Sequence, residues 1–279
     1  MSDRLERRVW SGRRRQLLGA SLAAAVVPAA VGCAAPAGLG ATQLYGKEAT
    51  HGAHWGYDAE AGPEHWAELD HTFAACAAGN TQSPVDIVPA KLLKADWLTE
   101  LQVTLRPTKV HAVNNGHTVQ VNYDRGSLLT FEKVTYALAQ FHFHTPSEHL
   151  VNGRGAAMEL HAVFQDAAKN LAVVGVLLQE RPDDAENPLL AKFWHAIPEK
   201  EGNAERELMV NVADSLPPEP GYWAYDGSLT TPPCSERVQW IVMRRPMPVS
   251  RAQLAKFRAI FPRNARPVQP LKDRLIKEF

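Results

Sequence analysis

The sequence lacks an excess of charge of either sign. Its 279 residues include 30 Lys and Arg against 30 Asp and Glu, so the formal net charge is zero. A protein that binds nucleic acid needs a basic excess over one face, and none stands out beyond the extreme N-terminus. The composition therefore argues against a nucleic-acid partner. It leaves ample material for a core, because 45% of the residues are apolar.

Long apolar runs are also missing. The uncharged stretch from Leu17 to about Gly32 is broken by Pro28, and it is shorter than the roughly 20 apolar residues of a transmembrane helix. The arginines that precede this stretch are Arg7, Arg8, Arg13, Arg14 and Arg15. A basic segment, a short apolar segment and small residues are typical of an export signal. We assign residues 1–41 to this signal and a short flexible segment that follows it. A buried helix is the alternative, but it would not usually begin with so many arginines.

The arginine pair Arg14-Arg15, followed by Gln16 and two leucines, resembles a twin-arginine signal, which exports a chain already folded. We therefore expect an exported protein, either periplasmic or associated with the cell envelope.

Cysteine is scarce, with three residues in the whole chain. Cys33 follows small residues and is a candidate lipid-anchor site, although signal cleavage nearby would remove it instead. Cys76 and Cys234 remain in either case. An even pair in an exported protein indicates a disulfide, and two buried thiols are the alternative.

From residue 42 to residue 279 no repeat, low-complexity tract or linker interrupts the sequence, which predicts a single domain. Residues rich in β-branched, aromatic and aliphatic side chains predict strands at Thr118–Tyr123, Gln140–His144, Met158–Phe164, Leu171–Leu178 and Val238–Val242. Two short helices are expected, from Pro188 to about Ile197 with Asn187 as N-cap, and from Arg251 to about Ile260 with Ser250 as N-cap. The predicted fold class is mainly β (α+β), with a large twisted, mostly antiparallel central sheet.

Two histidines alternate along the predicted strand Gln140–His144. Because side chains alternate across a strand, Gln140, His142 and His144 share one face. Glu159 and His161 share a face of the strand that follows. If the two strands pair, which a turn at Asn152-Gly153 would permit, three imidazoles converge.

Three histidines leave the fourth tetrahedral position of a zinc ion open to water, which is the arrangement of a catalytic site. Gln140 and Glu159 are suited to accept a hydrogen bond from the second ring nitrogen of a ligand. Ordinary half-buried histidines are the alternative for a His-x-His pair alone, but the third histidine with an acidic neighbour favours the metal site.

Further motifs extend along nearly all of the predicted domain. They are His54-Trp55-Gly56-Tyr57, Gly62-Pro63-Glu64-His65-Trp66, Gln82-Ser83-Pro84-Val85-Asp86-Ile87, Asn115-Gly116-His117, Phe141-His142-Phe143-His144, Ser147-Glu148-His149, Glu159-Leu160-His161, Ser228-Leu229-Thr230-Thr231-Pro232-Pro233, Gln239-Trp240 and Asn264-Ala265-Arg266-Pro267. In their order and spacing they resemble the α-carbonic anhydrases. The brevity of the segment between Phe143 and Ser147 resembles the bacterial branch of that family.

The resemblance implies a zinc enzyme that reversibly hydrates carbon dioxide to bicarbonate and a proton through a zinc-bound hydroxide. The metal ligands it implies are His142, His144 and His161. Thr230 would accept a hydrogen bond from the hydroxide and donate its own proton to Glu148. His117 would shuttle the released proton to solvent, because an unperturbed imidazole titrates near pH 6.5.

The resemblance assigns supporting roles to other residues. The apolar substrate pocket comprises Val163, Val173, Leu229, Thr231 and Trp240, the water network Tyr57, Asn115 and Gln120, and the residues behind the metal ligands Gln140, Glu159 and Asn264. Gln120 departs from the asparagine common in mammalian members. The resemblance also implies a Cys76–Cys234 disulfide, a cis Pro232-Pro233 peptide and a homodimer.

Three alternatives stay open. One is a non-catalytic carbonic-anhydrase-like envelope binding protein, but such relatives typically lose a metal ligand that this sequence retains. A zinc hydrolase is disfavoured because no His-Glu-x-x-His motif occurs. In a structural envelope lipoprotein, Cys33 would matter more than the histidines.

Overall fold

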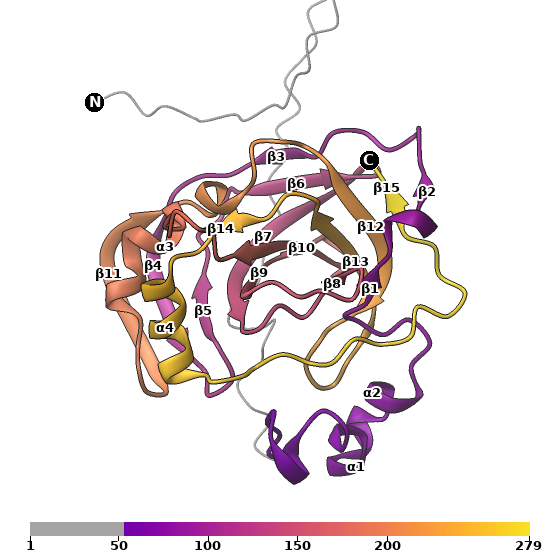
Figure 1. Cartoon of the computed structure of the whole chain (residues 1–279), viewed down its shortest axis with the longest axis horizontal. Coiled ribbons are helices and arrows are strands. Elements are labelled where there is room, and N and C mark those ends of the chain that lie inside the picture. The colour runs from indigo at the N-terminus through magenta and orange to yellow at the C-terminus, as the bar shows by residue number, and fades with distance from the viewer. Residues whose placement is uncertain (1–52) are drawn as a thin grey trace, which may run out of the picture.

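The computed structural model describes residues 53–279. The expected export signal and Cys33 lie outside the described residues. Within that part of the chain, most of the strands belong to one 13-stranded sheet whose main path runs β11-β4-β5-β7-β9-β10-β13-β12-β15-β2. Figure 1 shows this sheet as a strongly twisted layer that curves around the middle of the molecule.

The strands are β1 (Asp86–Ile87), β2 (Leu93–Lys94), β3 (Gln102–Thr104), β4 (Thr108–Asn114), β5 (Val119–Asn122), β6 (Leu128–Phe131), β7 (Val134–His144), β8 (Leu150–Val151), β9 (Met158–Gln165), β10 (Leu171–Gln179), β11 (Gly202–Val210), β12 (Tyr222–Ser228), β13 (Glu236–Met243), β14 (Met247–Pro248) and β15 (Lys277–Glu278). The α-helices are α1 (Trp66–Leu69), α2 (Ala75–Ala78), α3 (Pro188–Phe193) and α4 (Arg251–Ile260). Short 3₁₀ helices span Ala59–Ala61, His71–Phe73, Pro89–Lys91, Trp194–Ala196 and Val212–Ser215.

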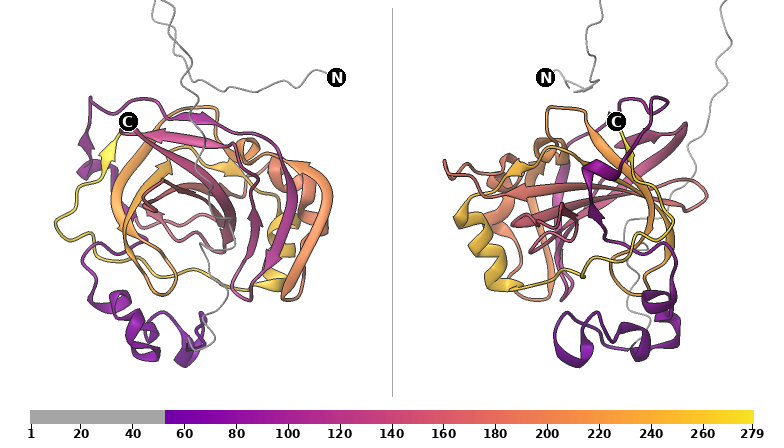
Figure 2. Two further views of the ribbon diagram at one scale, coloured as in Figure 1. Left: turned by 180° about the vertical axis from the view of Figure 1, so that it is seen from behind. Right: turned by 45° about the vertical axis from the view of Figure 1, so that its right-hand side comes forward.

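The predicted fold class is confirmed. Most strand pairs are antiparallel, including the run from β4 through β5, β7 and β9 to β10. The exceptions are parallel pairs, of which β10 with β13 lies in the middle of the sheet. In Figures 1 and 2 the short helices α1 and α2 lie below the sheet, away from the C-terminus.

Both helices expected from capping residues form. The Asn187 side chain accepts hydrogen bonds from the backbone N–H groups of Leu189 and Leu190, which begins α3. The α-helical part ends at Phe193, and a 3₁₀ turn continues to Ala196, so the predicted length is nearly correct. Ser250 forms a capping box with Gln253 at the start of α4.

The alternation of β7 separates an apolar core from a polar site. Phe141 and Phe143 are fully buried in the largest hydrophobic cluster, on the face opposite His142 and His144. On β9, Leu160 packs in the same cluster as the two phenylalanines. The core therefore holds the backs of both strands rigidly while their other faces carry the histidines.

No helix among residues 53–279 combines the length and apolar character required to cross a membrane.

Candidate metal centre and active site

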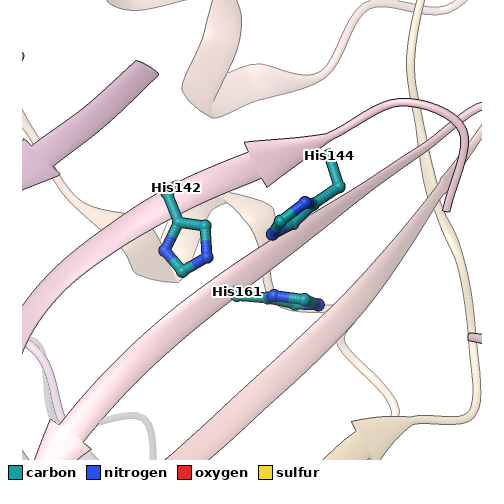
Figure 3. Close-up of side chains that lie close together, drawn as sticks. All are labelled: His142, His144 and His161. Atoms are coloured by element: carbon teal, nitrogen blue, oxygen red, sulfur yellow. The ribbon is translucent and has the colours of Figure 1, made fainter. Parts of the chain in front are cut away.

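The two histidine-bearing strands are neighbours. Strands β7 and β9 pair antiparallel, with His142 directly opposite His161. The ligand nitrogens of His142, His144 and His161 all lie within 4.8 Å of one another, and all three residues are buried. Figure 3 shows the three rings facing one another across the two strands. The conditional prediction of strand pairing and converging imidazoles is confirmed.

Each of the three rings has one nitrogen held by an acceptor. The contacts are His142 Nδ1 with Gln140 Oε1 at 2.9 Å, His144 Nδ1 with the Asn264 carbonyl at 2.7 Å, and His161 Nε2 with Glu159 Oε1 at 2.9 Å. The nitrogens opposite these contacts are His142 Nε2, His144 Nε2 and His161 Nδ1. Among the described residues, His144 Nε2 is buried without a hydrogen-bond partner. Three neutral imidazoles with fixed tautomers fit a divalent metal of the zinc type.

The surroundings favour neutral rings. Burial lowers the pKa of His142 well below its ordinary value, and His144 and His161 add to that effect. Burial also lowers the pKa of His144, to about 4, and that of His161. A neutral imidazole has the lone pair that a metal requires. The three histidines therefore do not have to release a proton before they bind a metal.

Glu159 is a fully buried carboxylate with several donors around it. Burial alone would raise its pKa, but His149 and His161 hold that pKa well below the ordinary value. One carboxylate oxygen accepts from the backbone N–H groups of Glu148 and His149 at 2.9 and 2.8 Å. The other accepts from the rings of His149 and His161. Glu159 therefore lies where sequence reasoning placed it, behind His161.

Glu148 is the second buried carboxylate of the site. Burial raises its pKa to about 7, while His161, the Arg266 N–H and the Thr230 hydroxyl oppose that rise. Its Oε1 accepts from the backbone N–H of Arg266 at 2.8 Å. Its oxygens lie 3.6 Å from His144 Nδ1 and 3.8 Å from His161 Nδ1. A cation held by these histidines would favour the ionised carboxylate.

His117 lies in a turn near the site, and its ring is stacked on Trp55 with 3.7 Å between ring centroids. Burial, with a smaller effect of His54, lowers the pKa of His117 to about 4. Asn115 Oδ1 accepts from the backbone N–H groups of His117 and Thr118, which fixes the turn. In this orientation the ring stays neutral at pH 7.

The expected apolar wall lies beside the metal centre. Val163, Val173 and Trp240 are buried in one cluster against which Leu229 packs. The Trp240 ring lies 4.8 Å from the His161 ring, centroid to centroid. Thr230 and Thr231 are also buried, and the Pro232-Pro233 peptide is cis.

The remaining predicted residues are polar or aromatic groups around the same strands. Gln120 lies opposite His142 in the pairing of β5 with β7, and its side chain donates to Asn122 Oδ1 at 2.6 Å. Tyr57 packs edge-on against the rings of Trp55 and Trp66. Asn264 contacts His144 through its backbone carbonyl, while its side-chain amide donates to the carbonyls of His117 and Phe143.

The predicted disulfide forms between Cys76 and Cys234, whose Cα atoms are 5.1 Å apart. Cys76 belongs to α2, and Cys234 follows the segment that carries Thr230. The bond thus attaches that segment to the N-terminal part of the described chain.

Sequence reasoning quoted His149 and Arg266 within motifs but assigned them no role. His149 joins Glu159 to Tyr225, and Arg266 is a buried guanidinium that donates to the carbonyls of Ser83 and Cys76. Burial of a charged or titratable residue between strands cannot be seen in a local pattern. The available signal was the proximity of both residues to assigned ones, in Ser147-Glu148-His149 and Asn264-Ala265-Arg266.

This geometry defines a class of protein: a twisted-sheet protein with a buried group of three histidines that fits a metal ion, an apolar wall and a buried acid. The sequence profile described as eukaryotic-type carbonic anhydrase matches residues 61–279. The chain belongs to the eukaryotic-type carbonic anhydrase family.

Relatives and solved structures agree with this assignment. A carbonic anhydrase of Nostoc sp. is 45% identical over 229 residues, which cover 81% of this chain and 86% of the relative. A carbonic anhydrase of Neisseria gonorrhoeae is 40% identical over 234 residues, which cover 82% of this chain and 90% of the relative. The α-carbonic anhydrase of Thermovibrio ammonificans, solved in complex with the inhibitor sulfanilamide, is 42% identical. It aligns with a TM-score of 0.76 over 81% of this chain and all of the solved one.

Proposed function

We propose that this protein catalyses the reversible hydration of carbon dioxide to bicarbonate and a proton, with a zinc ion held by His142, His144 and His161. The supporting observation is the convergence of three buried imidazoles whose second nitrogens are all held by acceptors. Carbonic anhydrases are the type case of zinc chemistry in which the metal lowers the pKa of a bound water to about 7 and so supplies a nucleophile at neutral pH.

In this proposal Thr230 and Glu148 orient the attacking oxygen. Glu148 is held by the Arg266 N–H, so its carboxylate is fixed before substrate arrives. A hydroxyl has one proton to donate, and Thr230 gives that proton to Glu148. Only the lone pairs of the Thr230 oxygen then face the site. Thr230 therefore accepts a hydrogen bond from the attacking oxygen, which turns a lone pair of that oxygen toward carbon dioxide.

The apolar side chains of the site receive the substrate. Carbon dioxide has no net dipole, so a pocket formed by Val163, Val173 and Leu229 suits it better than a hydrogen-bonding one. Trp240 closes the same wall next to His161. Bicarbonate carries a charge that this wall does not stabilise, which favours its release.

The proton leaves through His117 in this proposal. Stacked on Trp55, the ring has a pKa of about 4 and does not hold a proton at pH 7. Transfer therefore requires the ring to move from Trp55 toward solvent, where its pKa returns toward 6.5. Asn115 keeps the backbone of the turn in place during this motion.

We also infer that the protein is exported to the periplasm or envelope. The Cys76–Cys234 disulfide supports this, because disulfides persist in oxidising compartments. The lipid anchor at Cys33, the twin-arginine route and the homodimer stay predictions.

The test is a stopped-flow hydration assay combined with metal analysis on one preparation of residues 42–279. We expect about one zinc per chain, loss of activity after chelation and recovery with zinc. His142→Ala should lose both zinc and activity, whereas His71→Ala, which alters an exposed histidine, should lose neither. A zinc-loaded wild-type protein without hydration activity would overturn the proposed function.

A further inference from the structure

A continuous chain of buried hydrogen bonds runs away from the metal centre. From His161 it passes through Glu159 Oε1 to His149 Nδ1 at 2.7 Å, and His149 Nε2 then lies 2.7 Å from the Tyr225 hydroxyl. Tyr225 lies 3.0 Å from Ser83 Oγ, which accepts from the backbone N–H of Ser228 at 3.1 Å. None of the side chains along this chain exceeds 2% exposure.

We propose that Tyr225 is a positioning residue for the metal centre: its hydroxyl holds His149 in the tautomer that donates to Glu159, and Glu159 in turn orients His161. This inference rests on the proposed zinc site, and it concerns residues that touch neither metal nor substrate.

The direction of each hydrogen bond follows from counting protons. When His161 binds a metal through Nδ1, its Nε2 carries the ring proton and donates to Glu159. The Glu159 carboxylate has only lone pairs, so His149 Nδ1 must also donate to it. A His149 ring with one proton then has an acceptor at Nε2, and Tyr225 is the donor that meets it.

The Ser83 hydroxyl completes this assignment. Tyr225 has given its single proton to His149, so Ser83 Oγ donates to Tyr225 and accepts from the Ser228 N–H. Every donor from the Ser228 N–H to His149 therefore points toward Glu159, and His161 donates to Glu159 from the metal side. Burial also raises the pKa of Tyr225, which keeps its donating proton in place.

Close packing leaves the side chains of this hydrogen-bond series little room to move. A Cβ at Gly175 would lie 2.9 Å from Glu159 Oε1, and one at Gly227 would lie 2.2 Å from Ser83 Oγ. Neither position tolerates a side chain without moving a member of the chain.

The end of this hydrogen-bond series that is farthest from the metal centre reaches the segment that carries Thr230. Ser83 and Ser228 hold each other through reciprocal bonds, because the Ser83 N–H also donates to Ser228 Oγ at 2.9 Å. Ser228 Oγ donates onward to the carbonyl of Leu229, next to Thr230. One set of hydrogen bonds thus connects the third metal ligand to the segment that bears the orienting threonine.

The test is zinc affinity, measured by competition with a chromophoric chelator. Tyr225→Phe removes the donor to His149, which frees that ring to change tautomer and present a lone pair to Glu159. We expect the zinc dissociation constant to rise about tenfold. This is the lower end of the effect typical of groups that orient metal ligands by hydrogen bonds. The matched control is Tyr222→Phe, because Tyr222 is also buried on β12 but donates to the Thr99 carbonyl at 2.7 Å. It should bind zinc within about twofold of wild type.

A double variant shows whether Tyr225 acts through Glu159. In a Glu159→Gln background the carboxylate is gone, so adding Tyr225→Phe should change the zinc dissociation constant less than about twofold. Equal weakening in both backgrounds would overturn the proposal, as would unchanged affinity in Tyr225→Phe alone.

A third variant tests which groups donate in this series of hydrogen bonds. Ser83→Ala leaves the Tyr225 donation to His149 intact, so it should weaken zinc binding less than Tyr225→Phe. A loss of tenfold or more in Ser83→Ala would contradict the direction, even if Tyr225→Phe did not fold. Wild-type protein that bound no zinc would refute the proposed function instead, so the two failures are distinguishable.

Discussion

Removing the Cys76–Cys234 bond is expected to lower the free energy of unfolding, mainly because the unfolded state gains conformational entropy. The bond joins residues separated by 158 positions, so it restricts a very long loop in the unfolded state. In the folded state the nearby contacts use backbone groups: the Cys76 carbonyl accepts from Arg266, and the Cys234 carbonyl accepts from Gln82. These contacts remain when the sulfurs are separated or replaced.

The magnitude follows from the loop length. Loop-closure entropy for 158 residues corresponds to about 5 kcal/mol at 25 °C. A domain of this kind has a free energy of unfolding of about 5–15 kcal/mol, so the loss is a large fraction of the total. Because the folded contacts persist, hydration activity well below the unfolding temperature should change much less than stability.

The assay is urea unfolding followed by tryptophan fluorescence, with zinc held at one saturating concentration because bound metal adds stability. Oxidised wild type, reduced wild type and a Cys76→Ala/Cys234→Ala double variant are compared. Reduced wild type keeps both sulfurs, so it separates the cross-link from the packing of Cys76 and Cys234 against Trp66. A difference below about 1 kcal/mol between oxidised and reduced protein would refute the loop-entropy reasoning.

Three further predictions follow from the site. Glu159→Gln should cost about 2–5 kcal/mol of folding free energy, measured by urea unfolding of the metal-free protein, because an amide cannot accept from donors on both sides; no loss would contradict the hydrogen-bond pattern. Trp55→Ala should raise the pKa of His117 from about 4 toward 6.5 in an NMR titration. The unfolded chain takes up this proton near pH 6.5 and the folded protein near pH 4, so stability falls as pH drops through that window; the variant should show a smaller fall, and an unchanged pH profile would argue against it. Gly227→Ala should destabilise by about 1–3 kcal/mol, since its Cβ would lie 2.6 Å from Trp240 Cδ1; a neutral effect in thermal unfolding would show that the site can relax.

Local patterns correctly predicted the two longer helices, several strands of the sheet and the face that carries the histidines. The period-2 alternation of residues 140–144 placed His142 and His144 together. The next long strand, β9, brought His161, because strands close in sequence are usually neighbours in a sheet. The capping residues Asn187 and Ser250 predicted both longer helices. These signals lie within a few residues of the structure that they determine.

Contacts between distant parts of the chain could not be predicted in the same way. Nothing in the alternation of β10 shows that it pairs in parallel with β13. The stacking of His117 on Trp55 and the burial of Arg266 also depend on tertiary packing. For the supporting residues, resemblance to a family supplied what periodicity could not.

The two hydrogen bonds that Asn264 and Arg266 make to the site have a consequence for biosynthesis. His144 is oriented by the carbonyl of Asn264, and Glu148 by the N–H of Arg266. A ribosome that works from the N-terminus makes both of these partners long after it has made strands β7 and β9. The emerging chain therefore carries all three imidazoles before the tautomer of His144 is set. Tight binding of a metal ion by these three histidines would therefore have to wait until translation of the domain is nearly complete.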